Sequence, residues 1–400
     1  MKVSISVPGR FWLFNLARQL IKKGYLNQLI TSYPKFEVVK YGIPKNKVDS
    51  VIIKEILTRG WNELPNFIKQ FYDPRYLICN IFENAATRLL KKSDIVVGGS
   101  TVSLEYIRKS KQQGAVTVIE HGSSHPRFQK RILEEEYEKY NINKILIHPK
   151  ILEKSEKEFD ETDYIFIPSS YVKRTFIERG FSEDKLIQVP YGVDLSEFKQ
   201  IKKKDDVFRV IFVGGMSLRK GVHYLLQAFT ELNLPNSELM LIGSINDEIK
   251  PFFKKYKVEK SKKQEISKSI NQGSKIRFIG HVPQKELYKY YSQGSVFVIM
   301  SIEEGLALVQ PQAMACGLPV ICTTNTGGED IIRKEKDGFV IPIRDMDALK
   351  EKLTCLYENP EIRDQMSESA KKRVSSGFTW DGYGDRIVKE YERILGESKE

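Results

Sequence analysis

The clearest chemical signal in the sequence is a loop that follows the apolar run 296–299. It reads SIEEGLALVQPQAMACG over residues 301–317, and its second part is typical of a helix in which Pro311 fits only the first turn. Backbone N–H groups at such a helix start bind anions, and Gly305 lets the backbone approach a phosphate closely. Glu304 would repel a phosphate, so its carboxylate suits sugar hydroxyls. The loop predicts a site for a phosphate with a sugar beside it.

A second loop of this kind is GGMSLRKG, residues 214–221, which lies between the apolar run 210–213 and an expected helix over 222–231. Its Arg219 and Lys220 would neutralise a diphosphate across the same cleft. One such charge alone is typical of a solvated loop. Two anion-binding loops in the same half of the chain, each after a strand, favour a binding site.

The first third of the chain has one comparable loop, residues 120–127, EHGSSHPR, after the apolar run 116–119. A lone histidine is as often a structural group as a functional one. Two histidines, an arginine and small polar residues together favour a site, in which His125 and Arg127 are candidate contacts for an acceptor phosphate. Gly9, in a shorter loop after the run 3–7, is a further candidate, with Arg10 as a phosphate contact.

These loops need elements that bring them together, and the chain provides a repeated alternation of short apolar runs with helical stretches. The runs cover residues 3–7, 95–97, 116–119 and 164–167, and then 210–213, 238–242, 275–279, 296–299, 319–322 and 339–341. Such alternation predicts α/β architecture with parallel sheets, whose ligands bind at the carboxyl ends of the strands. We expect two doubly wound Rossmann-like domains that face a central cleft.

The expected boundaries follow from a charged stretch, Lys202–Asp206, which we interpret as a linker. The prediction is an N-terminal Rossmann-like domain over 1–195 and a C-terminal one over 206–378. A last helix over 379–400 is expected to pack towards the first domain. The lysine-rich residues 246–274 are expected to form a helical excursion and a mobile loop.

Charge is distributed unevenly along the 400 residues, whose net charge is +12. Residues 1–150 carry 25 Lys and Arg against 13 Asp and Glu, and residues 151–400 carry 39 of each. The first part therefore predicts an anionic partner: nucleic acid, a phospholipid surface or a phosphorylated substrate. General solubility is an equally good explanation of the surplus.

Several classes of protein lack their signature here. The sequence has no GxGxxG after its first apolar run, no GxxxxGK[ST], no HExxH and no pair of cysteines at metal spacing. This weakens a dehydrogenase, a P-loop enzyme and a zinc protein, and no recognised nucleic-acid-binding motif appears. No segment is long and apolar enough to span a bilayer, and the N-terminus lacks a signal peptide. We expect a cytoplasmic protein, at most peripheral to the inner face of a membrane.

The sequence resembles the family 4 type of GT-B fold glycosyltransferases, which are retaining and metal-independent. The resemblance is carried by the ordered segments VPYGVD (189–194), FVGGMSLRKGVHYLLQAF (212–229), IRFIGHVP (276–283), EEGLALVQPQAMACGLPVI (303–321) and TGGEDII…DGFVIP (326–342). It implies that the domain over 1–195 lies on the acceptor side and that the domain over 206–378 binds the nucleotide sugar. The donor substrate would be a nucleotide diphosphate sugar, with no further cofactor.

The resemblance assigns roles to residues of the second half. It implies that Glu304 contacts the donor sugar's hydroxyls and that the backbone around Gly305, Leu306, Ala307 and Leu308 approaches the diphosphate. Gln312 stands where the family has the glutamate that holds the ribose hydroxyls, so it keeps a hydrogen-bond acceptor but loses the charge.

Other implied contacts lie elsewhere along the chain. Gly215 stands where the family has an arginine, and Arg219 beside the matching Lys220 supplies a cation from a nearby position. The turn that contains Val282 implies a site for the base, with His281 expected to pack. His121 matches a histidine that faces the donor sugar, and Gly9 faces the diphosphate or the acceptor.

The function that follows is transfer of a sugar from a nucleotide diphosphate donor to a hydroxyl with retention, for cell-surface polysaccharide or glycolipid synthesis. Arg219, Lys220 and the helix start near 306–309 would stabilise the leaving diphosphate, and the acceptor would be a glycan or a lipid-linked molecule. Two alternatives use the same fold: a nucleotide-sugar epimerase and a non-catalytic nucleotide-sugar-binding protein. A nucleic-acid partner is not expected.

Aromatic residues gather between basic ones over residues 61–76: Trp61, Phe67, Phe71, Tyr72 and Tyr76, with Lys69 and Arg75. Such a stretch would lie on a membrane or hold a lipid-linked acceptor. A helix that buries its aromatics in the core is the favoured interpretation. The same holds for Phe11 and Trp12.

Overall fold

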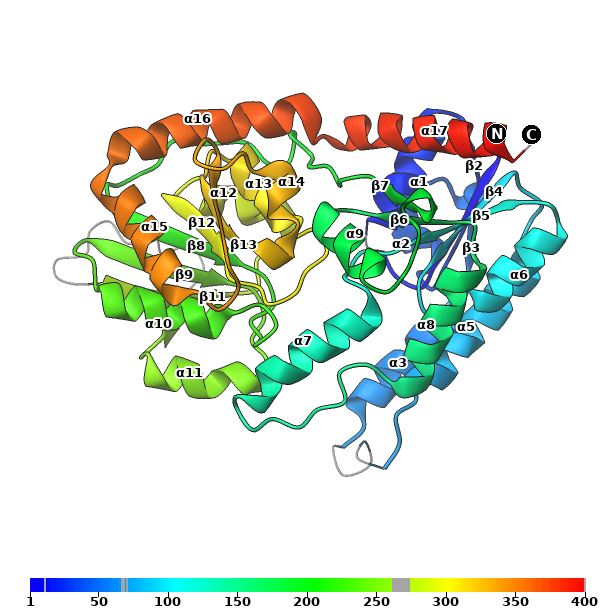
Figure 1. The fold of residues 1–400 in the computed structure, drawn as a ribbon, viewed down its shortest axis with the longest axis horizontal. Coiled ribbons are helices and arrows are strands. Elements are labelled where there is room, and N and C mark those ends of the chain that lie inside the picture. The colour runs from blue at the N-terminus through cyan, green and yellow to red at the C-terminus, as the bar shows by residue number, and fades with distance from the viewer. Residues whose placement is uncertain (11, 66–68, 70, 261–273, 399–400) are drawn as a thin grey trace.

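The computed structural model describes residues 1–10, 12–65, 69, 71–260 and 274–398, and it contains two parallel sheets covered by helices (Figure 1). Within the described residues the first sheet has seven strands in the order β3-β2-β1-β4-β5-β6-β7. Their bounds are β1 (Val3–Val7), β2 (Leu26–Thr31), β3 (Val48–Ser50), β4 (Ile95–Gly99), β5 (Val116–Glu120), β6 (Tyr164–Ile167) and β7 (Leu186–Gln188). All neighbouring pairs are parallel, as in a doubly wound fold.

The second sheet also has seven strands within the described residues, in the order β10-β11-β9-β8-β12-β13-β14, again all parallel. Their bounds are β8 (Phe208–Val213), β9 (Ser237–Ile242), β10 (Glu259–Lys260), β11 (Ser274–Gly280), β12 (Val296–Ile299), β13 (Val320–Thr323) and β14 (Gly338–Ile341). The central strands are buried along their whole length, because helices cover both faces of a parallel sheet.

The helices that cover the first sheet lie between its strands. They are α1 (Leu13–Lys22), α2 (Lys35–Val39), α3 (Ile53–Glu63), α5 (Arg75–Leu89), α6 (Leu104–Gln112), α7 (Pro126–Glu138), α8 (Pro149–Glu161) and α9 (Ser170–Ile177). Short 3₁₀ turns, η1 (Lys45–Lys47) and η2 (Glu183–Lys185), precede β3 and β7.

The second half adds α10 (Val222–Leu232), α11 (Lys250–Lys255), α12 (Leu287–Tyr291), α13 (Val309–Ala315), α14 (Gly328–Ile331), α15 (Met346–Glu358), α16 (Pro360–Gly377) and α17 (Trp380–Glu397). Its 3₁₀ turns are η3 (Asp247–Ile249), η4 (Gln284–Glu286) and η5 (Thr324–Thr326).

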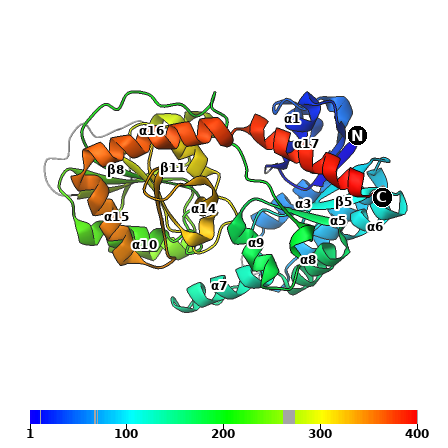
Figure 2. The same ribbon diagram turned by 45° about the horizontal axis from the view of Figure 1, so that its top comes forward.

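The end of the chain returns to the first domain, as the sequence predicts. Figures 1 and 2 show α16 and α17 running in succession from the second sheet to the first. The change of direction is held where Val193 N–H donates to the carbonyl of Phe378 at 2.8 Å. Beyond it, Asp381 of α17 accepts from Gln19 at 3.0 Å and pairs with Lys22 at 2.5 Å, both on α1. The GT-B arrangement expected from the sequence is therefore confirmed.

Helix α7 follows the first sheet in the chain but packs on the second domain. Its buried Ile132, Leu133 and Tyr137 belong to the hydrophobic core that includes β8 and α10. On the same face the carboxylate of Glu136 is fully buried and accepts hydrogen bonds from His223, at 3.0 Å, and from Tyr224, at 2.8 Å. Helix α7 thus joins the two domains, which the order of residues along the chain does not reveal.

The charged stretch Lys202–Asp206 runs between β7 and β8 without helix or strand, and it is anchored to the second domain where Asp205 pairs with the buried Arg209 of β8 at 3.0 Å. Lys203 donates to the carbonyl of Val207 at 2.7 Å, and burial lowers its pKa to about 8. The first correction concerns β2 and the edge strands β3, β7 and β10, which were not expected because they are short or interrupted by polar residues.

The aromatic stretch 61–76 is the second correction. Helix α3 has no buried residue, and Phe71 and Tyr72 are 81% and 56% exposed. The interpretation as a core helix is therefore wrong for Trp61, Phe71 and Tyr72. Phe67, Phe11 and residues 261–273 of the 246–274 excursion lie outside the described residues, whereas its described part contains η3, α11 and β10.

Candidate active site

A carboxylate and two cations meet at the carboxyl ends of β8 and β12. Glu304, in the loop after β12, forms ion pairs with both Arg219 and Lys220, in the loop after β8. Burial acts to raise the pKa of Glu304, but the charges of Lys220 and Arg219 outweigh it and lower that pKa. Burial likewise acts to lower the pKa of Arg219, and the carboxylates of Glu304 and Glu303 raise it instead. The carboxylate and the guanidinium are thus both ionised.

The backbone fixes these two loops against each other. Gly221 has φ +62°, and a Cβ there would lie 1.8 Å from the carbonyl oxygen of Met300, so the turn after Lys220 requires glycine. Ile302 N–H donates to the carbonyl of Arg219 at 2.8 Å. The close approach of the two backbones therefore places the cations beside Glu304.

Glu303, which the sequence did not single out, links this loop to the first domain. Its buried carboxylate accepts from the backbone N–H of Ser124 at 3.0 Å, from the hydroxyl of Ser124 at 2.8 Å and from Gln129 at 2.8 Å. Arg219 approaches the same carboxylate at 3.4 Å. One residue thus binds the first-domain loop and a cation of the second-domain site. The sequence shows only that two glutamates are adjacent, and it does not show which of them bridges the domains.

The loops of the two domains also touch through their glycines. A Cβ on Gly305 would lie 1.9 Å from the carbonyl oxygen of Gly122. On the other side the hydroxyl of Ser169 donates to the carbonyl of Gly305 at 2.6 Å. The short side chains in both loops are needed for this contact, in addition to any approach to a phosphate.

His121 is enclosed within the first domain. Its Nε2 donates to the carbonyl of Ser124 at 3.1 Å, so Nδ1 accepts from the hydroxyl of Ser100 at 2.9 Å. The ring packs edge-on against Phe159 and Phe176. Burial lowers the pKa of His121 to about 4, so the imidazole is neutral at pH 7. Its contact with a donor sugar stays a prediction, and such a contact requires that one of these hydrogen bonds be exchanged.

The other candidates of the first domain differ in accessibility. His125 is buried and accepts from the backbone N–H of Arg127 at the start of α7, and burial lowers its pKa to about 4. Arg127 pairs with Glu156. Gly9 is half-buried, and Arg10 is exposed and donates to the hydroxyl of Tyr41 at 2.8 Å. Arg10 and Arg127 are therefore exposed to solvent, whereas His125 is not.

The loop that opens α13 is mostly buried. Leu306 and Ala307 are buried, Leu308 is half-buried, and Ala307 N–H donates to the carbonyl of Thr326 at 3.2 Å. The N–H of Ala307 is thus engaged, so a phosphate expected here must meet its neighbours. Gln312, on α13, accepts from the hydroxyl of Tyr291 at 3.4 Å.

The remaining two candidates lie at other strand ends of the second sheet. Gly215 is exposed after β8, with the hydroxyl of Ser244 as the nearest atom to its missing Cβ at 3.4 Å. Val282 is buried after β11, whereas its neighbour His281 is exposed and does not pack as expected. Both stay predicted contacts of the nucleotide.

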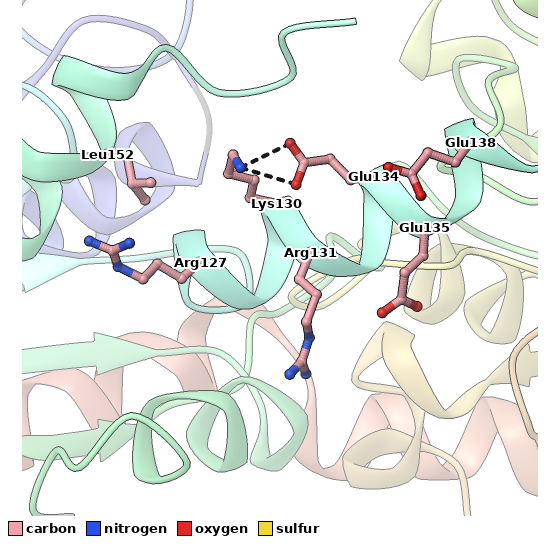
Figure 3. Close-up of a pocket in the computed structure, with 7 residues that line it drawn as sticks. All are labelled: Arg127, Lys130, Arg131, Glu134, Glu135, Glu138 and Leu152. Atoms are coloured by element: carbon pink, nitrogen blue, oxygen red, sulfur yellow. Dashed lines mark hydrogen bonds and ion pairs between the residues drawn. The ribbon is translucent and has the colours of Figure 1, made fainter. Parts of the chain in front are cut away.

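A separate groove of about 400 Å³ runs along α7 (Figure 3). Lys130 and Glu134 pair on one side of the helix, whereas Arg131 and Glu135 point to the other side. Its walls carry neither Glu304 nor Arg219, and Gln129 of the same helix reaches Glu303. The groove therefore adjoins the charged cluster through α7.

No group of three His, Cys, Asp or Glu side chains within the described residues is arranged to hold a metal ion. Within the same residues, no helix combines the length and the apolar character needed to cross a membrane.

Solved structures with this architecture define the class of fold. Sucrose-phosphate synthase from Thermosynechococcus elongatus superposes with a TM-score of 0.72 and 17% identity, over 99% of this chain and 100% of that one. Alr3699/HepE from Anabaena, in complex with UDP-glucose, superposes with a TM-score of 0.70 and 14% identity, over 98% of this chain and 100% of that one. The chain has the GT-B fold, with two Rossmann-like domains.

Sequence similarity then gives the family. Residues 194–373 match the family model for glycosyl transferases group 1, so this part of the chain is a domain of that family. Spore coat protein SA from Bacillus subtilis is 28% identical over 188 residues, 46% of this chain and 48% of that protein. The capsular polysaccharide biosynthesis glycosyltransferase CapM from Staphylococcus aureus is 25% identical over 256 residues, 60% of this chain and 64% of that protein. The matches thus span about half to two thirds of these relatives.

Proposed function

We propose that this protein transfers a sugar from a nucleotide diphosphate donor to a hydroxyl acceptor, with retention at the anomeric carbon. The observation that carries the proposal is the ionised cluster of Glu304, Arg219 and Lys220, placed in the domain that matches glycosyl transferases group 1. The nucleotide binds the second domain and the acceptor approaches from the first. Support for a nucleotide-sugar donor comes from Alr3699/HepE, a protein of the same fold solved with UDP-glucose.

The cluster can meet the charge that develops on a leaving diphosphate. A lysine ammonium has three N–H donors and an arginine guanidinium has five, so Lys220 and Arg219 can bind phosphate oxygens while keeping Glu304 as a partner. Cations that are already positioned stabilise the transition state without reorganising at the moment of reaction. Glu304, held by both, presents its carboxylate to the sugar hydroxyls. With two cations beside the phosphates, we propose that transfer does not depend on a divalent metal.

The route with retention uses the leaving group itself. The glycosidic bond to the diphosphate breaks as the acceptor oxygen bonds to the same face of the anomeric carbon, and the released phosphate oxygen takes the acceptor's proton. Arg219 and Lys220 hold that phosphate beside the reacting carbon. For the acceptor we propose a glycan or lipid-linked molecule of polysaccharide or glycolipid synthesis, a proposal supported by the similarity to CapM.

The first experiment is a thermal-shift screen with UDP, GDP, ADP and their sugars. A nucleotide that binds only the folded state raises the unfolding midpoint, and we expect one base to be selected. Lys220→Met should remove most of the shift, whereas Lys250→Met, at an exposed ion pair with Asp247, should keep it. If no nucleotide stabilises the protein, the proposal is wrong.

The second experiment measures turnover of the stabilising sugar nucleotide, with and without EDTA. Lys220→Met and Glu304→Gln should each lower the rate about a hundredfold or more, as does the loss of one preorganised donor in other enzymes. Slow hydrolysis without acceptor identifies a transferase site. An isomerised sugar nucleotide would identify an epimerase, and binding without any turnover would identify a binding protein. A rate that is unchanged in both variants contradicts the mechanism.

A further inference from the structure

We infer that α3 and the residues beside it form a surface that docks on an anionic phospholipid bilayer. The inference deepens the proposed function, on which it rests for its purpose, because it states where a lipid-linked acceptor would be presented. The observations that carry it concern the exposure and charge of one end of the first domain.

Helix α3 is amphipathic, but its apolar face points away from the protein and its polar face points towards it. Its apolar residues at positions 53, 56, 57 and 64 fall on one helical face, and their exposed fractions are 45%, 60%, 36% and 36%. The polar side faces the protein instead, where the carboxylate of Glu55 accepts from the hydroxyl of Ser32 at 2.7 Å and pairs with Lys54 at 2.9 Å. Surface helices of globular proteins turn their apolar face inward. Because the apolar face of α3 is turned outward, it requires an apolar environment outside the protein to cover it.

The apolar surface continues beyond the helix. The ring of Trp61 on α3 contacts the ring of Tyr72 with centroids 6.3 Å apart, and the neighbouring Phe71 is 81% exposed. Arg75 joins a further loop to this end of the domain, because it donates to the carbonyls of Ile145, itself 65% exposed, and Leu146. Figure 1 shows α3 and the loop between α7 and α8 at the same end of the molecule. Tryptophan and tyrosine at the rim of an apolar patch are typical of membrane interfaces.

The charge around this patch selects an anionic bilayer. Residues 139–150, which include the exposed Ile145, carry three lysines and no acidic residue, and Arg59 on α3 is 80% exposed. The whole surplus of positive charge lies in residues 1–150. A second copy of the chain would bring the same cations face to face, because a symmetric dimer pairs each patch with itself. Negatively charged lipid headgroups match the cations while the acyl chains receive the apolar residues.

The test is sedimentation with vesicles, without any sugar nucleotide, so that it does not depend on donor binding. We expect the protein to bind vesicles of phosphatidylglycerol and phosphatidylcholine and to bind pure phosphatidylcholine much more weakly, with the difference reduced at high salt. The double variant Ile56→Gln, Leu57→Gln should bind at least tenfold more weakly. Ile362→Gln, at a similarly exposed apolar residue on α16, should bind as the wild type does.

A second readout reports on the place of contact. Brominated lipids quench tryptophan that enters the bilayer interface, and the fluorescence lost on binding should come from Trp61, so Trp61→Phe should abolish it. Circular dichroism of each variant confirms its folding. The inference is overturned if wild type ignores anionic vesicles at low salt or if the double variant binds equally well. It is also overturned if wild type is a dimer in solution that the double variant dissociates.

This result is separable from the proposed function. If the protein binds vesicles but no nucleotide stabilises it, the docking surface is supported and the transferase function is contradicted. If a nucleotide raises the unfolding midpoint and is turned over but the protein does not bind vesicles, the transferase function is supported and the docking surface is contradicted.

Discussion

The loops that follow β5 in the first domain and β12 in the second both lie at the carboxyl ends of parallel strands, but their chemistry differs. After β12, Glu304 is ionised, paired with two cations and within reach of solvent. After β5, His121 is neutral, buried and hydrogen-bonded at both ring nitrogens. Loops at strand ends thus present ionised side chains in one domain and a neutral, buried side chain in the other.

The charged groups are concentrated in the second domain. The second-domain loop keeps its charges in place through partners of its own domain, with Arg219 and Lys220 both coming from the loop after β8. The first-domain loop offers a backbone surface, Gly122 to Ser124, on which the second-domain loop rests through Glu303 and Gly305. Changes in the two loops should therefore have different consequences.

The largest effect is expected where the loops meet. Gly305→Ala places a methyl group 1.9 Å from the carbonyl of Gly122, so the two loops must separate and the charged cluster loses its position. We expect turnover of the sugar nucleotide to fall by two to three orders of magnitude. Gly396→Ala, at a site with nothing within 4 Å, serves as the control and should have no effect on turnover. Normal turnover in Gly305→Ala would show that the contact is dispensable.

The pKa values of Glu120 and Glu304 are shifted in opposite directions from that of a free glutamate. Burial raises the pKa of Glu120, the last residue of β5, to about 7 despite its hydrogen bond from Trp12, whereas the pKa of Glu304 is lowered. A raised folded pKa gives stability below the unfolded value of about 4.5, which is lost as the pH rises towards 7. A lowered folded pKa gives stability above about 4.5, which is lost as the pH falls.

Glu120→Gln and Glu304→Gln test this contrast by urea unfolding between pH 4 and pH 8. Relative to wild type, Glu120→Gln should gain about 3 kcal/mol as the pH rises from 4.5 to 7, since the amide cannot ionise. Glu304→Gln should lose stability relative to wild type at pH 7 and recover it at low pH. Parallel pH profiles for the two variants would contradict the assignment of opposite environments.

A smaller effect is expected for the residue that bridges the two loops. Glu303→Ala leaves the buried N–H and hydroxyl of Ser124 without their acceptor, which costs about 1–3 kcal/mol of unfolding free energy. Ser124→Ala removes only one of the two bonds and should cost less. Glu358→Ala, at an exposed position at the end of α15, is the control. Equal stability of all three would show that the bridge does not hold the domains.

The smallest effect concerns Gln312, within the second domain. Gln312→Glu restores a charged acceptor, and hydrogen bonds to charged groups are stronger than those to neutral ones. We expect the affinity for the selected nucleotide to rise a few-fold, measured by calorimetry, with little change in stability because Gln312 is only half-buried. Unchanged or weaker binding of the nucleotide would contradict the predicted contact between Gln312 and the ribose.

Much of the second domain could be predicted from the sequence. Buried parallel strands are continuous apolar runs, so residues 210–213 and 296–299 were recognisable as β8 and β12. The glycines and charges that follow each strand then fell at the carboxyl edge of one sheet, because all strands of that sheet are parallel. The pairing of Glu304 with Arg219 and Lys220 was within reach of the sequence for that reason.

The short edge strands β3 and β7 could not be predicted from the sequence, because they have three residues each and little apolar pattern. The exposure of α3 also escaped prediction. Its period is that of an ordinary core helix, and periodicity alone does not say whether protein or a second phase meets the apolar face.

The sequence by itself determined the two α/β domains, the positions of the post-strand loops and the charge surplus of residues 1–150, because these depend on local pattern and composition. Tertiary structure alone decided that Glu303 rather than Glu304 joins the domains, that His121 is enclosed and that α7 packs on the second domain. The physical reason is that these facts depend on which surfaces meet across the cleft. Adjacent residues such as Glu303 and Glu304 have the same chemistry, and only the three-dimensional contacts give them different partners.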